Sequence, residues 1–444
     1  MTDGAGSNRV GWTSAAAASA LRGEIRVPGD KSVSHRAIML AALAEGTSRV
    51  SGFLEGEDTR ATARAFAHMG VRIEAPRDNE RIVHGAGLHG LSAPHAALDC
   101  GNAGTGMRLL TGLLAGQPFD TTLIGDESLS RRPMRRVIEP LTRMGARIEA
   151  GEGGVPPLHI CGKRELCGIA YELPVASAQV KSAILLAGLY ARGETHVREP
   201  HPTRDYTERM LLAFGWPIDF TPGSARLKGG HRLRATDVVV PADFSSAAFF
   251  LVAASIVTGS ELVLRDVGIN PRRTGLLQAL RLMGADIAEA NPRLLGGEAV
   301  ADLIVRAAPL RGIDVPVELV PDMIDEFPAL FIAAAVARGT TRIRGAAELR
   351  VKESDRLAVM AKGLRMLGVR IEETPDGAVI DGGTVQGGCV DSAGDHRCAM
   401  SFAVAGLCAS DVVGIADCAN VATSFPGFVE LANGCGFGLR ATAD

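Results

Sequence analysis

The sequence predicts a mixed α/β (α+β) protein built from six βαβαββ repeats. One short phrase occurs in five copies, FAHMGVRIEA, LTRMGARIEA, LLAFGWPIDF, LRLMGADIAE and LRMLGVRIEE. In each copy the pattern predicts that a helix ends, a glycine turns the chain and a strand begins. A sixth, more diverged copy, ELANGCGFGL, lies close to the end of the chain. Self-similarity with a period of about 70 to 80 residues is the signature of a repeat architecture in which neighbouring units share a core.

Between these amphipathic helices lie six far more apolar segments, which read AIMLAALA, MRLLTGLLA, KSAILLAGLYA, AAFFLVAASIV, ALFIAAAVA and CAMSFAVAGLCA. A helix that is apolar all round must be surrounded by other elements, whereas a helix with a polar face can lie against a sheet and meet water. One repeat cannot bury its apolar helix alone, so we expect three repeats to gather around a shared core. Six repeats then make two lobes, each part of an inside-out α/β barrel with helices inside and strands outside.

The composition argues against several classes of protein. A chain of 444 residues is too long for one ordinary core, and a hydrophobic content of 46% argues against disorder. The 47 basic and 50 acidic residues leave a net charge of −3, which argues against a broad surface for nucleic acid. Any site for an anion must therefore come from locally gathered Lys and Arg.

The cysteines and the first residues favour a cytoplasmic protein. The eight cysteines form no CxxC pair and no His/Cys cluster with the spacing of metal ligands, so we expect reduced thiols and no metal. The start, MTDGAGSNRVGWTSAAAASA, lacks the basic and apolar regions of a signal peptide. No run of about eighteen apolar residues follows, so we expect no membrane span.

The leading edges of the six apolar helices carry mostly ionisable or hydroxyl groups, in the phrases DKSVSHR, GNAGTGMR, ASAQVKS, ADFSSAA, MIDEFPA and GDHRCAM. Free backbone N–H groups and the positive end of the helix dipole lie at the same place. If the central helices of each lobe point the same way, a cleft between the lobes collects these ends and concentrates positive potential. This arrangement predicts a small, highly anionic substrate. The alternative is a repeat scaffold with no chemistry.

The first of these helices allows both interpretations. In PGDKSVSHRAIMLAALAEG, Asp30 or Ser32 can cap the first turn, and Gly46 can close the helix in a left-handed turn. Lys31 and Arg36 then stand beside free backbone N–H groups, a combination that suits a phosphate or a carboxylate. A capped helix with two solvated cations explains the same residues equally well.

Other motifs are ambiguous when each is taken alone. GNAGTG has the wrong glycine order for a dinucleotide fingerprint, and PGDKS puts Asp30 where a P-loop needs glycine, so we expect neither an NAD nor an ATP site. The arginine run SLSRRPMRRV is typical of a solvated face. RVKESDRL places Glu353 between Lys352 and Arg356 on one helix face, where surface ion pairs are common.

Taken together and in order, these phrases resemble the 5-enolpyruvylshikimate-3-phosphate (EPSP) synthase family, the 3-phosphoshikimate 1-carboxyvinyltransferases. The resemblance runs from about Gly23 to Gly434 and rests on GDKSVSHR, GNAGTGMR, RPM, ASAQVKSA, TRDYTE, MIDEFP, RVKESDRL, DHRCAMSF and ATSFPGF. It implies transfer of the enolpyruvyl group of phosphoenolpyruvate to the 5-hydroxyl of shikimate 3-phosphate, in the shikimate pathway of aromatic amino-acid biosynthesis. This addition–elimination has no redox step, so no cofactor is implied.

The resemblance also implies where the lobes begin and end. Residues 30–240 would form the N-terminal lobe, on the shikimate 3-phosphate side, and residues 1–29 plus 241–444 the C-terminal lobe, which carries the catalytic Asp and Glu and the phosphoenolpyruvate side. We expect a cytoplasmic monomer whose partners are these two small-molecule substrates.

Site residues follow from the resemblance, motif by motif. The implied ligands of shikimate 3-phosphate are Lys31, Ser32, Arg36, Ser177, Ala178, Gln179 and Arg204. Those of phosphoenolpyruvate are Lys31, Gly104, Arg132, Arg356 and Arg397, with Asn102, Thr105 and Lys352 in the same substrate-binding phrases. Asp325 is implied as a ligand and as the base or aligner for the 5-hydroxyl, while Glu353 and Lys31 shuttle protons and His396 lies nearby.

Two features concern the branch of the family. One branch of the family has a Lys before Thr-Phe-Pro, whereas ATSFPGF in this sequence has Thr423 and Ser424 at that place. The second branch, which is of the glyphosate-insensitive type and has MIDE phrases, is therefore the closer match. Gly104 stands where insensitive members carry Ala, which leaves glyphosate sensitivity open.

Two other functions explain part of the sequence. The UDP-N-acetylglucosamine enolpyruvyl transferase family is built from the same repeats but carries a Cys in a mobile loop, and GDESLSRRP has none. A non-catalytic scaffold that binds an anionic metabolite has no use for Asp325 and Glu353 among arginines.

Overall fold

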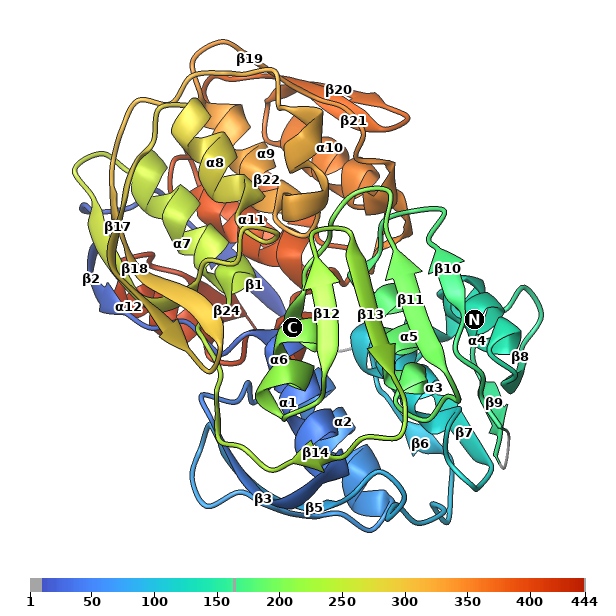
Figure 1. Ribbon diagram of the computed structural model, residues 1–444. Helices are drawn as coiled ribbons and strands as arrows, with labels where there is room; N and C mark the ends of the chain where they lie inside the picture. The colour runs from blue at the N-terminus through green and yellow to red at the C-terminus, as the bar shows by residue number, and fades with distance from the viewer. Residues whose placement is uncertain (1–9, 163–164, 443–444) are drawn as a thin grey trace, which may run out of the picture. The chain divides into compact units, whose positions relative to one another are not determined.

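The computed structural model describes residues 10–162 and 165–442 and confirms the predicted mixed α/β class (Figure 1). The chain divides into two compact units. We call Pro28–Pro241 with Leu294–Ala299 the N-terminal unit. The described residues of Met1–Val27, Ala242–Arg293 and Val300–Asp444 form the C-terminal unit.

Three buried helices form the centre of the N-terminal unit, namely α1 (Lys31–Leu43), α3 (Gly104–Leu114) and α5 (Ala178–Gly188). Their apolar side chains belong to one buried cluster. Helices α3 and α5 approach closely at Gly112, where a Cβ atom would lie 2.1 Å from the carbonyl oxygen of Ala183. A glycine is therefore required at this crossing. Further helices pack against the central ones, namely α2 (Glu57–His68), α4 (Arg135–Arg143) and α6 (Tyr206–Ala213).

Three sheets cover the central helices of the N-terminal unit. Their strands are β3 (Ala44–Ser51), β4 (Arg72–Glu74), β5 (Glu80–Ala86), β6 (Leu98–Asp99), β7 (Thr121–Ile124), β8 (Arg147–Ala150), β9 (Leu158–Cys161), β10 (Ala170–Glu172), β11 (Glu194–Arg198), β12 (Ile218–Thr221), β13 (Ser224–Lys228), β14 (Leu233–Arg234) and β15 (Val238–Val239). The strand orders are β14-β3-β5-β4 with β15 also on β3, β6-β7-β9-β8, and β10-β11-β13-β12. In each sheet a parallel pairing is followed by two antiparallel ones, as βαβαββ repeats require.

The C-terminal unit repeats this plan around its own buried cluster. Its central helices α7 (Phe244–Ile256), α9 (Phe327–Val336) and α11 (His396–Gly406) pack on one another (Figure 1). The other helices are α8 (Gly275–Leu282), α10 (Arg356–Met366) and α12 (Phe428–Gly434). Short 3-10 helices are η1 (Leu129–Arg131) in the N-terminal unit and η2 (Val317–Leu319), η3 (Pro321–Met323), η4 (Ala347–Val351) and η5 (Ala419–Thr423) in the C-terminal unit.

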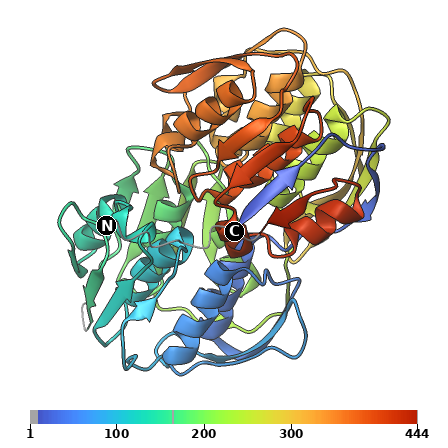
Figure 2. The same ribbon diagram turned by 180° about the vertical axis from the view of Figure 1, so that it is seen from behind.

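Both ends of the chain contribute strands to the C-terminal unit. The strands are β1 (Gly11–Ser14), β2 (Arg22–Ile25), β16 (Glu261–Gly268), β17 (Asp286–Leu295), β18 (Glu298–Arg306), β19 (Thr340–Ile343), β20 (Arg370–Thr374), β21 (Gly377–Asp381), β22 (Gly388–Asp391), β23 (Val413–Ala416) and β24 (Arg440–Thr442). They form sheets in the orders β22-β23-β1-β24, β17-β18-β16-β2 and β19-β21-β20. Figure 2 shows the blue strand β1 beside the red strands with which it pairs.

The six predicted repeats are confirmed, because each unit holds three central helices and three sheets. One local prediction is wrong, since Gly46 does not close the first helix. Helix α1 ends at Leu43, Ala44 is already extended with φ −80° and ψ 159°, and Gly46 lies inside β3 with φ 112°. The chain passes from helix to strand without a loop because Ala44 pairs at once with Leu233 of β14.

Candidate active site

The first predicted site residues stand at the start of α1. Asp30 caps the helix, because its Oδ1 accepts a hydrogen bond of 2.8 Å from the N–H of Val33. Lys31 and Ser32 are the first two helical residues, and Nζ of Lys31 lies 2.7 Å from Oδ2 of Asp58 in α2. The Asp58 side chain is only 7% exposed, so Lys31 already has a largely buried partner.

Arg36 lies one turn further along α1 and is buried. Its guanidinium donates to Oγ1 of Thr207 at 2.7 Å, to Oγ of Ser182 at 2.8 Å and to the carbonyl of Ser32 at 2.9 Å. Burial, followed by the charge of Arg204, lowers the pKa of Arg36 to about 10, so the group remains a cation at neutral pH. Two neighbouring guanidinium groups form a favourable setting for a phosphate.

The starts of α3 and α5 are joined by side chains. Arg132, which follows η1, donates from Nη2 to Oδ1 of Asn102 at 2.6 Å. Gln179 donates from Nε2 to Oγ1 of Thr105 at 2.8 Å, and Nη1 of Arg108 donates to Oε1 of Gln179 at 2.8 Å. Predicted ligands from three phrases that are far apart in the sequence therefore meet at the start of α3.

Glycine at position 104 leaves room for these guanidinium groups. A Cβ atom on Gly104 would lie 3.0 Å from Nη1 of Arg132 and 3.1 Å from Nη1 of Arg108, tighter than most side-chain contacts. At the neighbouring helix, Ser177 caps α5 by accepting a backbone N–H at 3.4 Å, and Ala178 is the first helical residue.

A buried cation in α5 holds this helix to α6, which carries Thr207, and to the residue that follows β11. Nζ of Lys181 lies 2.8 Å from Oε2 of Glu199 and 2.8 Å from Oε1 of Glu208, and all three side chains are at most 3% exposed. Burial raises the pKa of Glu208. Burial alone would lower the pKa of Lys181, but the carboxylates of Glu208 and Glu199 outweigh it and raise that pKa. Ser182 and Thr207 are each adjacent to a member of this triad.

In the C-terminal unit the predicted residues gather around Asp325, two residues before α9 begins. Its Oδ2 lies 3.1 Å from Nη1 of Arg273, and its Oδ1 lies 3.5 Å from both Nζ of Lys352 and Nη1 of Arg356. Arg397, in the first turn of α11, donates to the backbone carbonyl of Asp325 at 3.1 Å. The loop before α9 is thus surrounded by cations.

Arg356 begins α10 and connects two further carboxylates. Its Nη2 lies 2.5 Å from Oε2 of Glu353, and its Nε lies 2.8 Å from Oδ2 of Asp395. Burial alone would raise the pKa of Asp395, but the charge of Arg356 outweighs burial and lowers that pKa. Asp395 also caps α11, whose first residue is the buried His396.

The predicted residues therefore fall into two groups, one in each unit. We call the first the N-terminal group, made of Lys31, Ser32, Arg36, Asn102, Gly104, Thr105, Arg132, Ser177, Ala178, Gln179 and Arg204. The C-terminal group is Asp325, Lys352, Glu353, Arg356, His396 and Arg397. Outside these groups, Thr423 and Ser424 are buried, and the hydroxyl of Thr423 donates to the carbonyl of Asn420 at 2.7 Å.

The charged partners of these residues that lie outside the predicted set include Asp58, Arg108, Asp126, Arg273, Glu326 and Asp395. Asp58 stands in the first turn of a helix, where an acidic residue needs no special partner. Asp395 carried a usable signal, because it precedes an apolar helix as a capping residue does. Arg108 carried one too, because it lies one helical turn beyond the glycine-rich turn GNAGTG, where backbone N–H groups can approach an anion.

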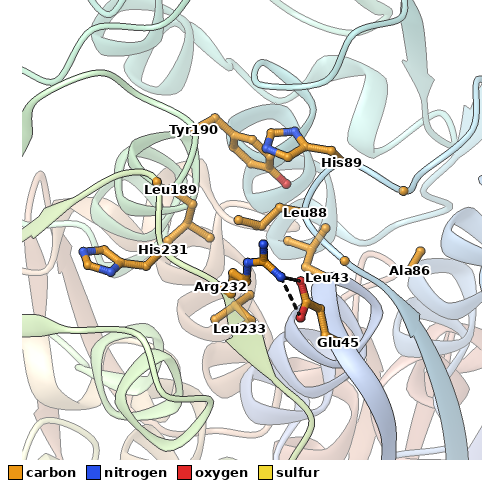
Figure 3. A pocket seen from close by; sticks show the side chains of 13 residues that line it. Leu43, Glu45, Ala86, Leu88, His89, Leu189, Tyr190, His231, Arg232 and Leu233 are labelled. Atoms are coloured by element: carbon orange, nitrogen blue, oxygen red, sulfur yellow. Dashed lines mark hydrogen bonds and ion pairs between the residues drawn. The ribbon is translucent and has the colours of Figure 1, made fainter.

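A separate cavity of about 460 Å³ lies in the N-terminal unit (Figure 3). Leu43 and Leu189 line it, so it lies at the C-terminal ends of α1 and α5, opposite to the predicted residues. Glu45 and Arg232 form an ion pair at its wall, with a shortest distance of 3.2 Å. Helix C-terminal ends carry partial negative charge, so this cavity is a poor site for an anionic substrate.

The described part of the chain holds neither a cluster of metal-ligating side chains nor a helix that could span a membrane. No group of three or more His, Cys, Asp or Glu side chains there could hold a metal ion. Among the same residues, no helix combines the length and the apolar character needed to cross a membrane.

Comparison with known proteins gives a consistent result. Residues 15–431 match the family model for EPSP synthase (3-phosphoshikimate 1-carboxyvinyltransferase). A protein named 3-phosphoshikimate 1-carboxyvinyltransferase from Xanthomonas euvesicatoria pv. vesicatoria (strain 85-10) is 69% identical over 421 residues, which cover 95% of this chain and 96% of the relative. A solved EPSP synthase from Acinetobacter baumannii is 52% identical with a TM-score of 0.89, covering 98% of this chain and 100% of that one.

We expect Lys181→Met to destabilise the N-terminal unit strongly. The substitution keeps most of the side-chain volume but leaves two buried carboxylates without their cation, which costs about 3 to 5 kcal/mol. Urea unfolding, followed by intrinsic fluorescence, measures the loss as a lower midpoint.

The matched control for this variant is Arg192→Met, since Arg192 pairs with Glu165 at 2.9 Å while both side chains are more than 70% exposed, at 72% and 75%. An exposed pair contributes at most about 1 kcal/mol, so this midpoint should hardly move. Equal shifts in the two variants would contradict a special role for the buried triad.

Proposed function

The chain belongs to the EPSP synthase (3-phosphoshikimate 1-carboxyvinyltransferase) family, and on this premise we propose which of its residues carry out the reaction. It is a transferase of the shikimate pathway that moves the enolpyruvyl group of phosphoenolpyruvate to the 5-hydroxyl of shikimate 3-phosphate and releases phosphate. The observation that carries the proposal is one network in which the carboxylates of Asp325 and Glu353 both contact Arg356.

The N-terminal group is proposed to bind shikimate 3-phosphate. Arg36 and Arg204 provide neighbouring positive charges, and the tips of α1 and α5 provide backbone N–H groups. The proposed ligands are Lys31, Ser32, Arg36, Ser177, Ala178, Gln179 and Arg204. The proposed lobes are residues 30–240 and residues 1–29 plus 241–444, which the two compact units support.

Phosphoenolpyruvate is proposed to use residues of both groups. Arginine suits its carboxylate and phosphate because a guanidinium can donate two parallel hydrogen bonds. The proposed ligands are Lys31, Gly104, Arg132, Arg356 and Arg397, together with Asn102, Thr105 and Lys352.

Proton transfer is assigned to the carboxylates and Lys31. In the addition step, the O–H bond of the 5-hydroxyl breaks, its oxygen bonds to C2 of phosphoenolpyruvate, and the methylene carbon takes up a proton. In the elimination step, that carbon loses a proton as the bond from C2 to the phosphate oxygen breaks. Asp325 takes or aligns the hydroxyl proton, while Glu353 and Lys31 transfer the proton at carbon, with His396 nearby. A general acid must be protonated, and the negative charges of the two substrates oppose the ion pair with Arg356, which favours the ionised form of Glu353.

The protein is further proposed to act as a monomer in the cytoplasm. Its eight cysteines are free thiols, which suits a reducing compartment.

We expect Glu353→Gln to lower turnover by about 10²- to 10⁴-fold, the usual contribution of a general acid–base group. The measurement is phosphate release by the purified protein with both substrates, and with each omitted in turn. A passive binding scaffold would release no phosphate under any of these conditions.

Glu373→Gln is the matched control for this variant. Glu373 also pairs with an arginine, Arg350, at 2.9 Å, and its side chain is 26% exposed, against 25% for Glu353. Glu373→Gln should leave turnover unchanged. Near-normal turnover in Glu353→Gln would show that Glu353 does not transfer the proton.

The chain is also proposed to belong to the second branch of the family while remaining sensitive to glyphosate. Inhibition should be competitive with phosphoenolpyruvate, and Gly104→Ala should weaken it by about tenfold or more, because an added Cβ presses on Arg132 and Arg108. Inhibition constants measured at several phosphoenolpyruvate concentrations test this. Absence of competition in the parent protein, or an unchanged constant in the variant, would contradict it.

A further inference from the structure

We infer that Arg273 is a positioning residue that holds the carboxylate of Asp325 in place. The inference rests on the proposed function, because it presupposes the role of Asp325. Arg273 lies in the phrase NPRRTG, between β16 and α8, which carries none of the predicted site residues. Its Nη1 lies 3.1 Å from Oδ2 of Asp325, closer than the 3.5 Å that separates Lys352 and Arg356 from Oδ1.

The opposite side of the Arg273 guanidinium is fixed by the start of α7. Nη2 donates to Oγ of Ser245 at 2.5 Å, and it lies 3.5 Å from Oδ1 of Asp243, the residue that caps α7. Ser245 in turn donates to Oε1 of Glu326, which also lies 3.6 Å from Nη1 of Arg273. The side chains of Arg273 and Asp243 are each 6% exposed. A guanidinium with so many fixed partners has one orientation, and that orientation sets where its Nη1 meets Asp325.

Asp325 and Glu326 are consecutive carboxylates that share this one guanidinium. The Glu326 side chain is fully buried, at 0% exposure, while Asp325 is 16% exposed. Without Arg273 the two neighbouring anions would lose their common cation, and Glu326 would keep the hydrogen bond from Ser245 and a longer contact of 3.8 Å to the cation of Arg397. Like charges in a poorly solvated site repel, so the segment before α9 would shift. A displacement of about 1 Å at a reacting group can cost about 10²-fold in rate.

We expect Arg273→Gln to lower kcat by about 10- to 100-fold while the KM of each substrate changes by less than about threefold. Arg273→Lys should recover part of kcat, because lysine keeps the charge but cannot donate from two nitrogens at once. The control is Arg272→Gln in the same loop, since Arg272 is 38% exposed and pairs with Asp322 at 3.2 Å. That variant should retain kcat.

A double-mutant cycle separates positioning from a purely structural role. Asp325→Asn should lower kcat by about 10²- to 10⁴-fold. In that background Arg273→Gln should cost less than about threefold, because the carboxylate that it positions is gone. If the two losses multiply instead, or if Arg273→Gln retains full kcat, the inference is overturned. If Asp325→Asn itself turns over normally, the role proposed for Asp325 fails, whatever Arg273 does.

Should Arg273→Gln fail to fold, Ser245→Ala replaces it in the same cycle. This variant removes the hydroxyl that fixes Arg273 and leaves the charge in place. The inference is supported if Ser245→Ala lowers kcat in the parent protein but causes no further loss of kcat in the Asp325→Asn background. An unchanged kcat in the Ser245→Ala single variant contradicts it.

Discussion

The need to bury helices that have no polar face determines the rest of this structure. In α9 every residue from Phe327 to Ala335 is buried, and in α7 every residue from Phe244 to Ser255 is buried. A sheet covers one side of such a helix, so the other sides must meet further helices. Three central helices with three sheets satisfy this requirement in each unit.

This packing also brings helix tips together. In the N-terminal unit the bond from Arg36 to Ser182 joins α1 to α5, and the bond from Gln179 to Thr105 joins α5 to α3. In the C-terminal unit Arg397 at the start of α11 bonds to the loop before α9. The polar groups that a buried helix cannot carry along its length are thus concentrated at its N-terminal end, where the helix dipole favours anions.

The cations at these tips, and the cation at the start of α10, are held by carboxylates from other segments. Lys31 pairs with Asp58, Arg356 with Asp395, and Lys181 with two glutamates. Buried ion pairs contribute little net stability but are costly to break, so their main effect is to fix the direction of each charge. A site arranged in this way before substrates bind loses less entropy when they do.

Local patterns explain what could be predicted from the sequence. The repeats, the apolar helices and a cap at Asp30 depend on neighbouring residues, and all three are present. Long-range partners leave no local pattern, so the pair of Arg273 with Asp325 was missed. The arginine run shows the same limit, because Arg132 is buried and bonds to Asn102 while Arg131 is exposed and pairs with Glu127. The roles of individual site residues came from the family resemblance and remain proposals.

The central claim is that the tips of the central helices carry the substrates. The most direct measurement is a crystal structure of the protein with shikimate 3-phosphate and glyphosate bound. We expect both ligands to contact residues of the N-terminal group at the tips of α1, α3 and α5, with Asp325 within hydrogen-bond distance of the 5-hydroxyl. Electron density for either ligand in the cavity beside Leu43 and Leu189, at the opposite ends of α1 and α5, would contradict the claim.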